Sequence, residues 1–237
     1  MAYAAISDGS PADISSCAEQ FASQLRKAHV LALAGGACAG DEPDGAGKWI
    51  ASLLRLPVVQ KEIEELLQKR GGLVLGVGNG FQALVRTGLL PFGRMVPAGE
   101  QTIALAKNKI GIHVSDIVRV HITSNKGPWL SKLRTGDVYN MPVSCSEGRI
   151  VCDALQAEDL VNNGQIVAQY VDSDGFLAGD MPGNPTGSMH AIEALISPDG
   201  RVLGKMGHFE RCTGGTFINV PGCYNMTLFE SARAYFK

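Results

Sequence analysis

The chain has 237 residues, of which 45% are hydrophobic and 19% are charged, and its formal net charge is -2. A chain of this length can bury a sizeable core in one domain without help from disulfides or metals. The near-neutral charge argues against a nucleic-acid partner or an anionic membrane surface, and no run of eighteen apolar residues could span a bilayer. Six cysteines without a CxxC pair predict reduced thiols in a cytoplasmic protein, and no structural zinc site.

The first half of the chain alternates between helical and strand patterns. Apolar residues recur at helical spacing in four segments, and two short apolar runs end in glycines, which is typical of buried strands. Helices are predicted over residues 12–27, 49–56, 58–68 and 81–87, and strands over 29–34 and 73–77. This alternation predicts a parallel α/β sheet.

The second half has strand patterns without long helices between them. Predicted strands cover residues 116–124, 140–145, 149–152 and 166–171. Residues 188–205 predict a hairpin around the turn sequence Ser197-Pro198-Asp199-Gly200, and a helix over 229–236 closes the chain. No repeat or linker divides the sequence, so a single domain over residues 1–237 is expected.

Residues 75–82 read Leu-Gly-Val-Gly-Asn-Gly-Phe-Gln, a strand that passes through a glycine-rich turn into a helix. This is the layout of a nucleophile elbow, in which a sharp turn lifts one side chain above the sheet, at position 78 here. The alternative is a close-packed turn whose glycines serve only steric needs.

His208 and Glu210 follow a predicted strand and are two residues apart. They could form a general base and the carboxylate that orients it. The alternative is a surface histidine with a nearby salt bridge.

Residues 34–41, Ala-Gly-Gly-Ala-Cys-Ala-Gly-Asp, place small residues directly after a strand. Such a loop exposes backbone N–H groups that could stabilise an oxyanion. It lacks the GK[ST] ending of a nucleotide-binding P-loop, and a plain connecting loop remains the alternative.

Taken together, these segments resemble the class I glutamine amidotransferases, and among them the amidotransferase domain of phosphoribosylformylglycinamidine synthase, especially the long single-chain bacterial type. The resemblance runs almost from end to end. Its most specific strings are Gly40-Asp41-Glu42-Pro43-Asp44-Gly45, Gly80-Phe81-Gln82-Ala83-Leu84, Pro142-Val143-Ser144, Glu147-Gly148-Arg149, Gln169-Tyr170-Val171-Asp172, Asn184-Pro185-Thr186-Gly187-Ser188, Gly204-Lys205-Met206-Gly207-His208 and Asn219-Val220-Pro221-Gly222.

The resemblance implies a three-layer flavodoxin-like fold with a mixed, mainly parallel sheet. In the family a cysteine thiolate attacks the glutamine carboxamide, a histidine moves the protons, and ammonia passes to a synthetase domain. That partner domain, not this one, would bind ATP and Mg²⁺, so no cofactor is expected here. By position, the base is His208 with Glu210, the oxyanion loop is Gly35-Gly36, and the nucleophile position is Gly78. The remaining predicted pocket residues are Asn79, Gln82, His113 and Cys145.

The sequence departs from the family pattern around this same pocket. The family's Gly-Arg-His-Gln-Ser-Arg reads Gly-Ile-His-Val-Ser-Asp over residues 111–116, so that Ile112 and Asp116 replace two cations. Cys145 stands in place of a histidine, and Ala37 in place of a phenylalanine. Because glycine has no side chain, no acyl-enzyme can form at Gly78, and a glutaminase-inactive domain with a structural or regulatory role is predicted.

Glycine suits an elbow that has no nucleophile, because it adopts strained backbone conformations freely. Two alternatives stay open. The pocket could hold glutamine or a related small molecule through His208, Glu210 and the Gly35 loop without catalysis, or Cys38 or Cys145 could act as a relocated nucleophile.

The resemblance begins at about the family's second strand, which Tyr3–Ile6 would match. The chain is therefore expected to be shortened at its N-terminus, lacking the family's first strand and helix. An exposed central strand edge would favour self-association.

Overall fold

The computed structural model describes residues 9–36, 46–212 and 214–237. The α-helices in these ranges are α1 (Pro11–Leu25), α2 (Ala46–Leu54), α3 (Pro57–Gln68), α4 (Asn79–Thr87), α5 (Leu89–Phe92), α6 (Ala154–Asn162) and α7 (Leu228–Tyr235). The strands are β1 (Val30–Leu33), β2 (Leu73–Val77), β3 (Ile103–Lys107), β4 (Val114–Ile122), β5 (Val138–Cys145), β6 (Glu147–Cys152), β7 (Ile166–Val171), β8 (Ile192–Ile196) and β9 (Val202–Lys205). Three short 3-10 turns complete the set: η1 (Pro128–Leu130), η2 (Met189–Ala191) and η3 (Phe209–Arg211).

Local sequence signals explain where several helices begin and end. The hydroxyl of Ser10 accepts a hydrogen bond from the backbone N–H of Asp13, so it caps α1 as the Ser-Pro sequence predicts. Pro57 occupies the first turn of α3, and Gly88 ends α4 in the left-handed conformation that glycine adopts most easily. Gly88 thereby sets the C-terminal end of α4, the helix that begins at the elbow.

Seven strands form one mixed sheet in the order β1-β2-β9-β8-β7-β4-β5, and β3 and β6 form a separate antiparallel pair. The pairs β1–β2 and β2–β9 are parallel, whereas the other four pairs of the large sheet are antiparallel. The mixed α/β fold is confirmed, but the expected excess of parallel pairing is wrong. Antiparallel neighbours need only short turns, and the second half of the chain lacks the helical crossovers that parallel strands require.

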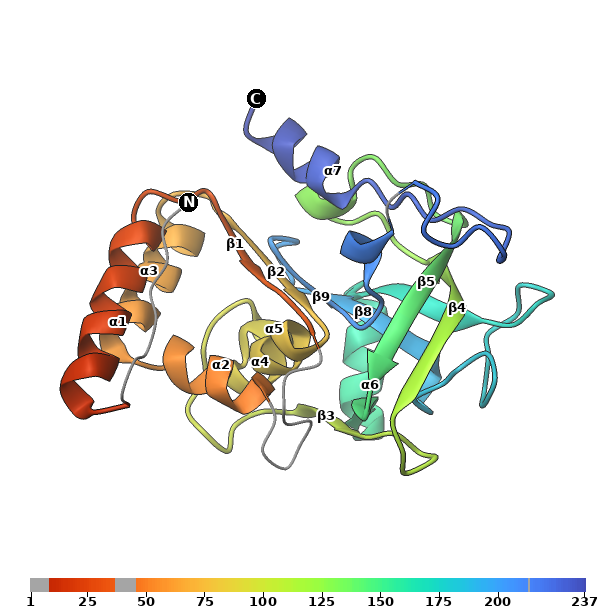
Figure 1. The fold of residues 1–237 in the computed structure, drawn as a ribbon, viewed down its shortest axis with the longest axis horizontal. Helices are drawn as coiled ribbons and strands as arrows, with labels where there is room; N and C mark the ends of the chain where they lie inside the picture. Colours follow the sequence, from red (N-terminus) through yellow and green to blue (C-terminus); the bar gives the residue numbers. More distant parts are fainter. Residues whose placement is uncertain (1–8, 37–45, 213) are drawn as a thin grey trace.

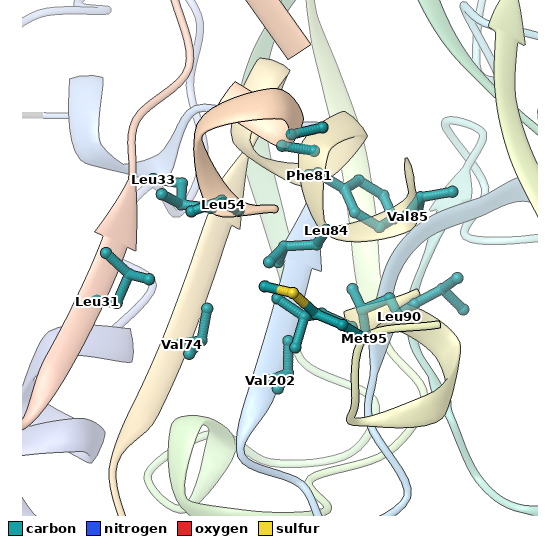
Figure 2. Close-up of a cluster of buried hydrophobic side chains, with 14 of the residues drawn as sticks. Leu31, Leu33, Leu54, Val74, Phe81, Leu84, Val85, Leu90, Met95 and Val202 are labelled. Atoms are coloured by element: carbon teal, nitrogen blue, oxygen red, sulfur yellow. The ribbon is translucent and has the colours of Figure 1, made fainter. Parts of the chain in front are cut away.

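The central strands β2, β9 and β8 of this sheet (Figure 1) are buried at every residue, and apolar layers pack on both faces of the sheet. One layer consists of side chains from α1, α3, α4 and α5 packed on Leu31, Val74 and Val202 of three adjacent strands (Figure 2). The opposite layer packs α7 and η1 on Leu73 and Leu75, among other strand residues. Every residue of β2 is therefore buried, as its continuous apolar sequence predicts for a central strand.

The predicted elements agree with the structure apart from short segments. The hairpin around Ser197 is confirmed as the antiparallel pair β8–β9, and its turn closes through a hydrogen bond from the Ser197 N–H to the Val202 carbonyl. The helices α5 and α6 and the strand β3 were not expected. The strand proposed over Tyr3–Ile6 lies outside the described residues.

Candidate active site

The turn after β2 has the backbone geometry of an elbow. Gly78 has φ 52° and ψ -111°, a conformation that L side chains rarely adopt. Its N–H donates to the carbonyl of Lys205 on the neighbouring strand, and its carbonyl accepts from the N–H of Gln82 in the first turn of α4. The elbow is therefore held on both sides by main-chain hydrogen bonds.

Glycines around the elbow allow the backbone elements to approach closely. A methyl group on Gly80 would lie 2.1 Å from the carbonyl oxygen of Leu33 in β1. A methyl group on Gly35 would lie 2.7 Å from both Cε1 of His208 and the carbonyl oxygen of Val77. The two glycine-rich segments predicted from the sequence thus meet in space, with β1 packed directly against the start of α4.

His208 lies against this elbow and is held by its predicted partner. The ring is almost completely buried, with 1% of the residue exposed, and its Nδ1 is 2.7 Å from Oε1 of Glu210. A Cβ built on Gly78 would be 3.6 Å from Nε2 of the same ring. The nitrogen opposite the carboxylate therefore faces the position where a nucleophile would stand, which is the geometry of a base with its orienting acid.

The surroundings of the Glu210 carboxylate stabilise its ionised form. Burial raises its pKa, but the hydrogen bond with His208 and further charges outweigh that effect, so that the pKa lies below its ordinary value. An ionised carboxylate on Nδ1 favours the tautomer that keeps a hydrogen there and leaves Nε2 as an acceptor.

A buried ion pair supports the segment that carries His208. Nζ of Lys205 is 3.0 Å from Oε1 of Glu193, and both side chains are at most 1% exposed. The ammonium also donates to the carbonyl of Gly207, whose N–H donates to the same Glu193 oxygen. Both backbone polar groups of Gly207, its N–H and its carbonyl, are thereby fixed immediately before the histidine.

His113 lies at the mouth of the site between two serines. Its Nε2 is 3.1 Å from Oγ of Ser144 and its Nδ1 is 3.2 Å from Oγ of Ser146. Cys145 between these serines is buried, and its carbonyl accepts a hydrogen bond from Asn108. The thiol of Cys145 is therefore buried at the end of β5 and does not lie on the elbow turn.

Gln82 closes the inner side of the site. Its Nε2 donates to the carbonyl of Glu147, and its Oε1 is buried without a hydrogen-bond partner among the described residues. Asn79 donates from its side chain to the carbonyl of Gly36. The amide side chains of the first turn of α4 thus join the elbow to both neighbouring loops.

These side chains surround a cavity of about 10 Å³, enough for about one water molecule. The structure brings seven of the nine predicted site residues to its wall, and the other two, Gly35 and Glu210, contact His208. Ile112 is 63% exposed and does not line the cavity. The predictions for Ala37 and Cys38 lie outside the described residues. The cavity lining is Gly36, Gly78, Asn79, Gln82, His113, Ser144, Cys145, Met206 and His208.

The sequence did not reveal the Lys205–Glu193 pair or Asn108. Glu193 and Lys205 are each the one charged residue in an otherwise apolar strand. Opposite charges on the two strands of a predicted hairpin can pair, so the sequence did contain a signal for this ion pair. Asn108 had no such signal, because its role depends on a loop conformation. In the part of the chain that the structure describes, no group of three His, Cys, Asp or Glu side chains could hold a metal ion, and no helix is long and apolar enough to cross a membrane.

Comparison with known proteins identifies the family of the chain. Residues 1–236 match the model of the CobB/CobQ-like glutamine amidotransferase domain. The chain belongs to this family. The predicted relationship to the glutamine amidotransferases is therefore confirmed over almost the entire sequence.

Curated relatives of this glutamine amidotransferase domain are named phosphoribosylformylglycinamidine synthase subunit PurQ. The protein from Gloeobacter violaceus is 37% identical over 69% of this chain and 63% of its own length, and that from Synechococcus sp. (strain JA-3-3Ab) is 37% identical over 68% and 61%. The matched segment therefore spans less than two thirds of the relatives.

Solved structures support the fold. The structure of PurLQS from Thermotoga maritima matches with a TM-score of 0.64 at 24% identity, over 88% of this chain and 80% of that one. The glutaminase domain of Trypanosoma brucei CTPS with bound acivicin matches with a TM-score of 0.51 at 15% identity, over 92% and 76%.

Proposed function

We propose that this chain is the glutamine amidotransferase-like part of a phosphoribosylformylglycinamidine synthase of purine biosynthesis, and that it no longer hydrolyses glutamine. The partner would be a synthetase subunit or domain that uses free ammonia, with this chain in a structural or regulatory role. Support for the pathway comes from the PurQ relatives and from the family match.

The observation that carries the loss of chemistry is Gly78. The base His208 and its acid Glu210 are in place, and Nε2 faces the elbow, yet the elbow has no side chain to deprotonate. Without the nucleophile, the remaining members of such a unit retain very little catalysis.

The cavity supports the same proposal. A volume of about 10 Å³ is far below the several hundred Å³ typical of a small-molecule site. This closed arrangement favours a structural role over the alternative of a pocket repurposed for a ligand.

A relocated thiol is the third possibility, and Cys145 is the candidate that the structure describes. Its side chain is buried beside Asn108, with Sγ 3.9 Å from the amide oxygen. Nucleophilic attack requires placement to within about an ångström, and this side chain does not lie on the elbow turn.

Treatment with acivicin followed by intact-protein mass spectrometry tests the proposal. The wild-type chain should remain unmodified, whereas Gly78→Cys should gain one adduct at residue 78, because the restored thiol would stand beside Nε2 of His208. An adduct on the wild-type chain, or ammonia release from glutamine that Cys145→Ser abolishes, would refute the loss of glutaminase chemistry.

The partner is tested by reconstitution with the synthetase from the same organism. We expect the complex to form product with ammonium chloride and not with glutamine. Failure of the two proteins to associate would contradict the assigned partner.

A further inference from the structure

A larger cavity, lined by residues of α5, α6 and the start of β3, lies outside the candidate active site. Its volume is about 390 Å³, which is within the range of pockets that hold small metabolites. It shares no lining residue with the cavity at the elbow. The lining is Pro91, Phe92, Arg94, Thr102, Ile103, Gln156, Asp159, Leu160, Asn163, Gln165 and Pro198.

A buried glutamine fixes the wall that α5 contributes. Gln165 is 4% exposed, and its Nε2 donates to the carbonyls of Pro91 in α5 and Ile196 in β8, both at 2.8 Å. The N–H of Ile196 donates in turn to the carbonyl of Gln165. This part of the wall is therefore rigid, and binding of a ligand need not order it.

One face of α6 supplies another wall. The lining residues of this helix and its C-cap recur at helical spacing, at positions 156, 159, 160 and 163. Leu160 is 3% exposed, whereas Asp159 and Asn163 are exposed to solvent. The helix therefore presents an apolar contact beside a carboxylate.

Two opposite charges line the cavity without pairing. Arg94 stands two residues after α5, and Asp159 lies on α6. Within the ranges that the structure describes, neither the Arg94 guanidinium nor the Asp159 carboxylate forms an ion pair or a hydrogen bond. Both charged groups are therefore available to a ligand in the cavity.

The charged residues that border the lining are already engaged. Asp199, in the turn between β8 and β9, accepts a hydrogen bond from Nε of Arg201 at 2.8 Å. Nζ of Lys126 donates to the carbonyl of Asn163, also at 2.8 Å. These neighbours therefore do not compete with a ligand for the two charges of the lining.

We propose that this cavity binds a small zwitterion, an α-amino acid with an apolar side chain. The Arg94 guanidinium binds the carboxylate, whose two oxygens match its planar set of donors. The Asp159 carboxylate accepts hydrogen bonds from the ammonium, which carries donors only. Phe92 and Leu160 contact the apolar side chain. A ligand with one charge satisfies only one of the two charged groups, so the zwitterion is preferred.

Isothermal titration calorimetry with L-phenylalanine tests the site, and hydrocinnamate and phenethylamine are the probes that each lack one of its charges. We expect saturable binding of L-phenylalanine, and binding about fivefold weaker or more for each of the other two, because each loses one charge-assisted contact. Arg94→Gln should weaken the binding of L-phenylalanine and hydrocinnamate but not of phenethylamine. Asp159→Asn should weaken the binding of L-phenylalanine and phenethylamine but not of hydrocinnamate.

The matched controls are Arg134→Gln and Asp174→Asn, which remove the same charges at exposed positions outside the cavity and should leave the dissociation constants unchanged. A circular-dichroism melting curve establishes that each variant is folded. Absence of saturable binding by L-phenylalanine, equal affinity for the three probes, or equal effects in the cavity and control variants would overturn the proposal. His208→Gln should not alter this binding, so the result is independent of the amidotransferase test.

Discussion

Substitution of Gly78 by alanine would measure the strain that the elbow imposes. At φ 52° and ψ -111° any residue with a Cβ is disfavoured, at a cost of order 1–3 kcal/mol. A methyl group there would meet its nearest atoms, Cε1 of His208 and Cα of Gly35, at 3.4 and 3.5 Å, which are ordinary contacts. Strain without collision therefore predicts that Gly78→Ala lowers the free energy of unfolding by about 1–3 kcal/mol.

Two further glycines provide the comparison for this experiment. Gly179→Ala adds a methyl group in open space at an exposed position where φ is not positive, so its effect should be neutral or slightly stabilising. Gly80→Ala forces a methyl group to within 2.1 Å of a carbonyl oxygen of β1 and should be more destabilising than Gly78→Ala.

Urea denaturation followed by circular dichroism gives the three free energies, provided that the slope with denaturant is unchanged. If Gly78→Ala were as stable as the wild-type chain, the elbow would not be strained. If it were as unstable as Gly80→Ala, collision and not backbone strain would be the cause. Either result would refute the explanation given for glycine at this position.

Two other perturbations address the groups behind the elbow. Lys205→Met should lower the free energy of unfolding by about 3–5 kcal/mol, because it leaves the Glu193 carboxylate buried without its cation. Adding Glu193→Gln should restore part of this loss in urea denaturation. A further loss in the double variant would show that the pair does not act as a unit. Glu210 has a pKa below its ordinary value of 4.5, so its contribution to stability is complete above that pH and is lost as the pH falls through the lower, folded-state pKa. The difference in unfolding free energy between wild type and Glu210→Gln should therefore shrink in denaturation series taken below about pH 4.5, and a difference that stays constant would contradict the carboxylate–imidazole contact.

The elbow and the base could be predicted from the sequence because each has a local signature. A buried strand that runs through Gly78 into a helix has few possible geometries, and His208 two residues before Glu210 on one turn brings the two side chains into reach. That His208 would lie beside the elbow at Gly78 was implied only by the resemblance to the amidotransferase family. No local pattern states which strands are neighbours.

The features that escaped prediction depend on tertiary context. Lys205 and Glu193 each read as a charged residue within a short strand, yet adjacent antiparallel strands bury them together. The strand β3 is short, and its partner β6 lies forty or more residues further along the chain, so its pairing leaves little trace in the local sequence. The balance of parallel and antiparallel neighbours was likewise misjudged, because strand order is set by packing.

The clamp on Gly207 has a consequence for motion. Residues 206–208 follow β9 as irregular chain, and such segments usually open independently of the core. Here the N–H and the carbonyl of Gly207 are both bonded to a buried ion pair inside the core, and the Gly78 N–H donates to the carbonyl of the same Lys205. The histidine segment therefore cannot loosen without breaking hydrogen bonds to a buried pair carried by β8 and β9, so we expect it to open more slowly than an ordinary surface loop.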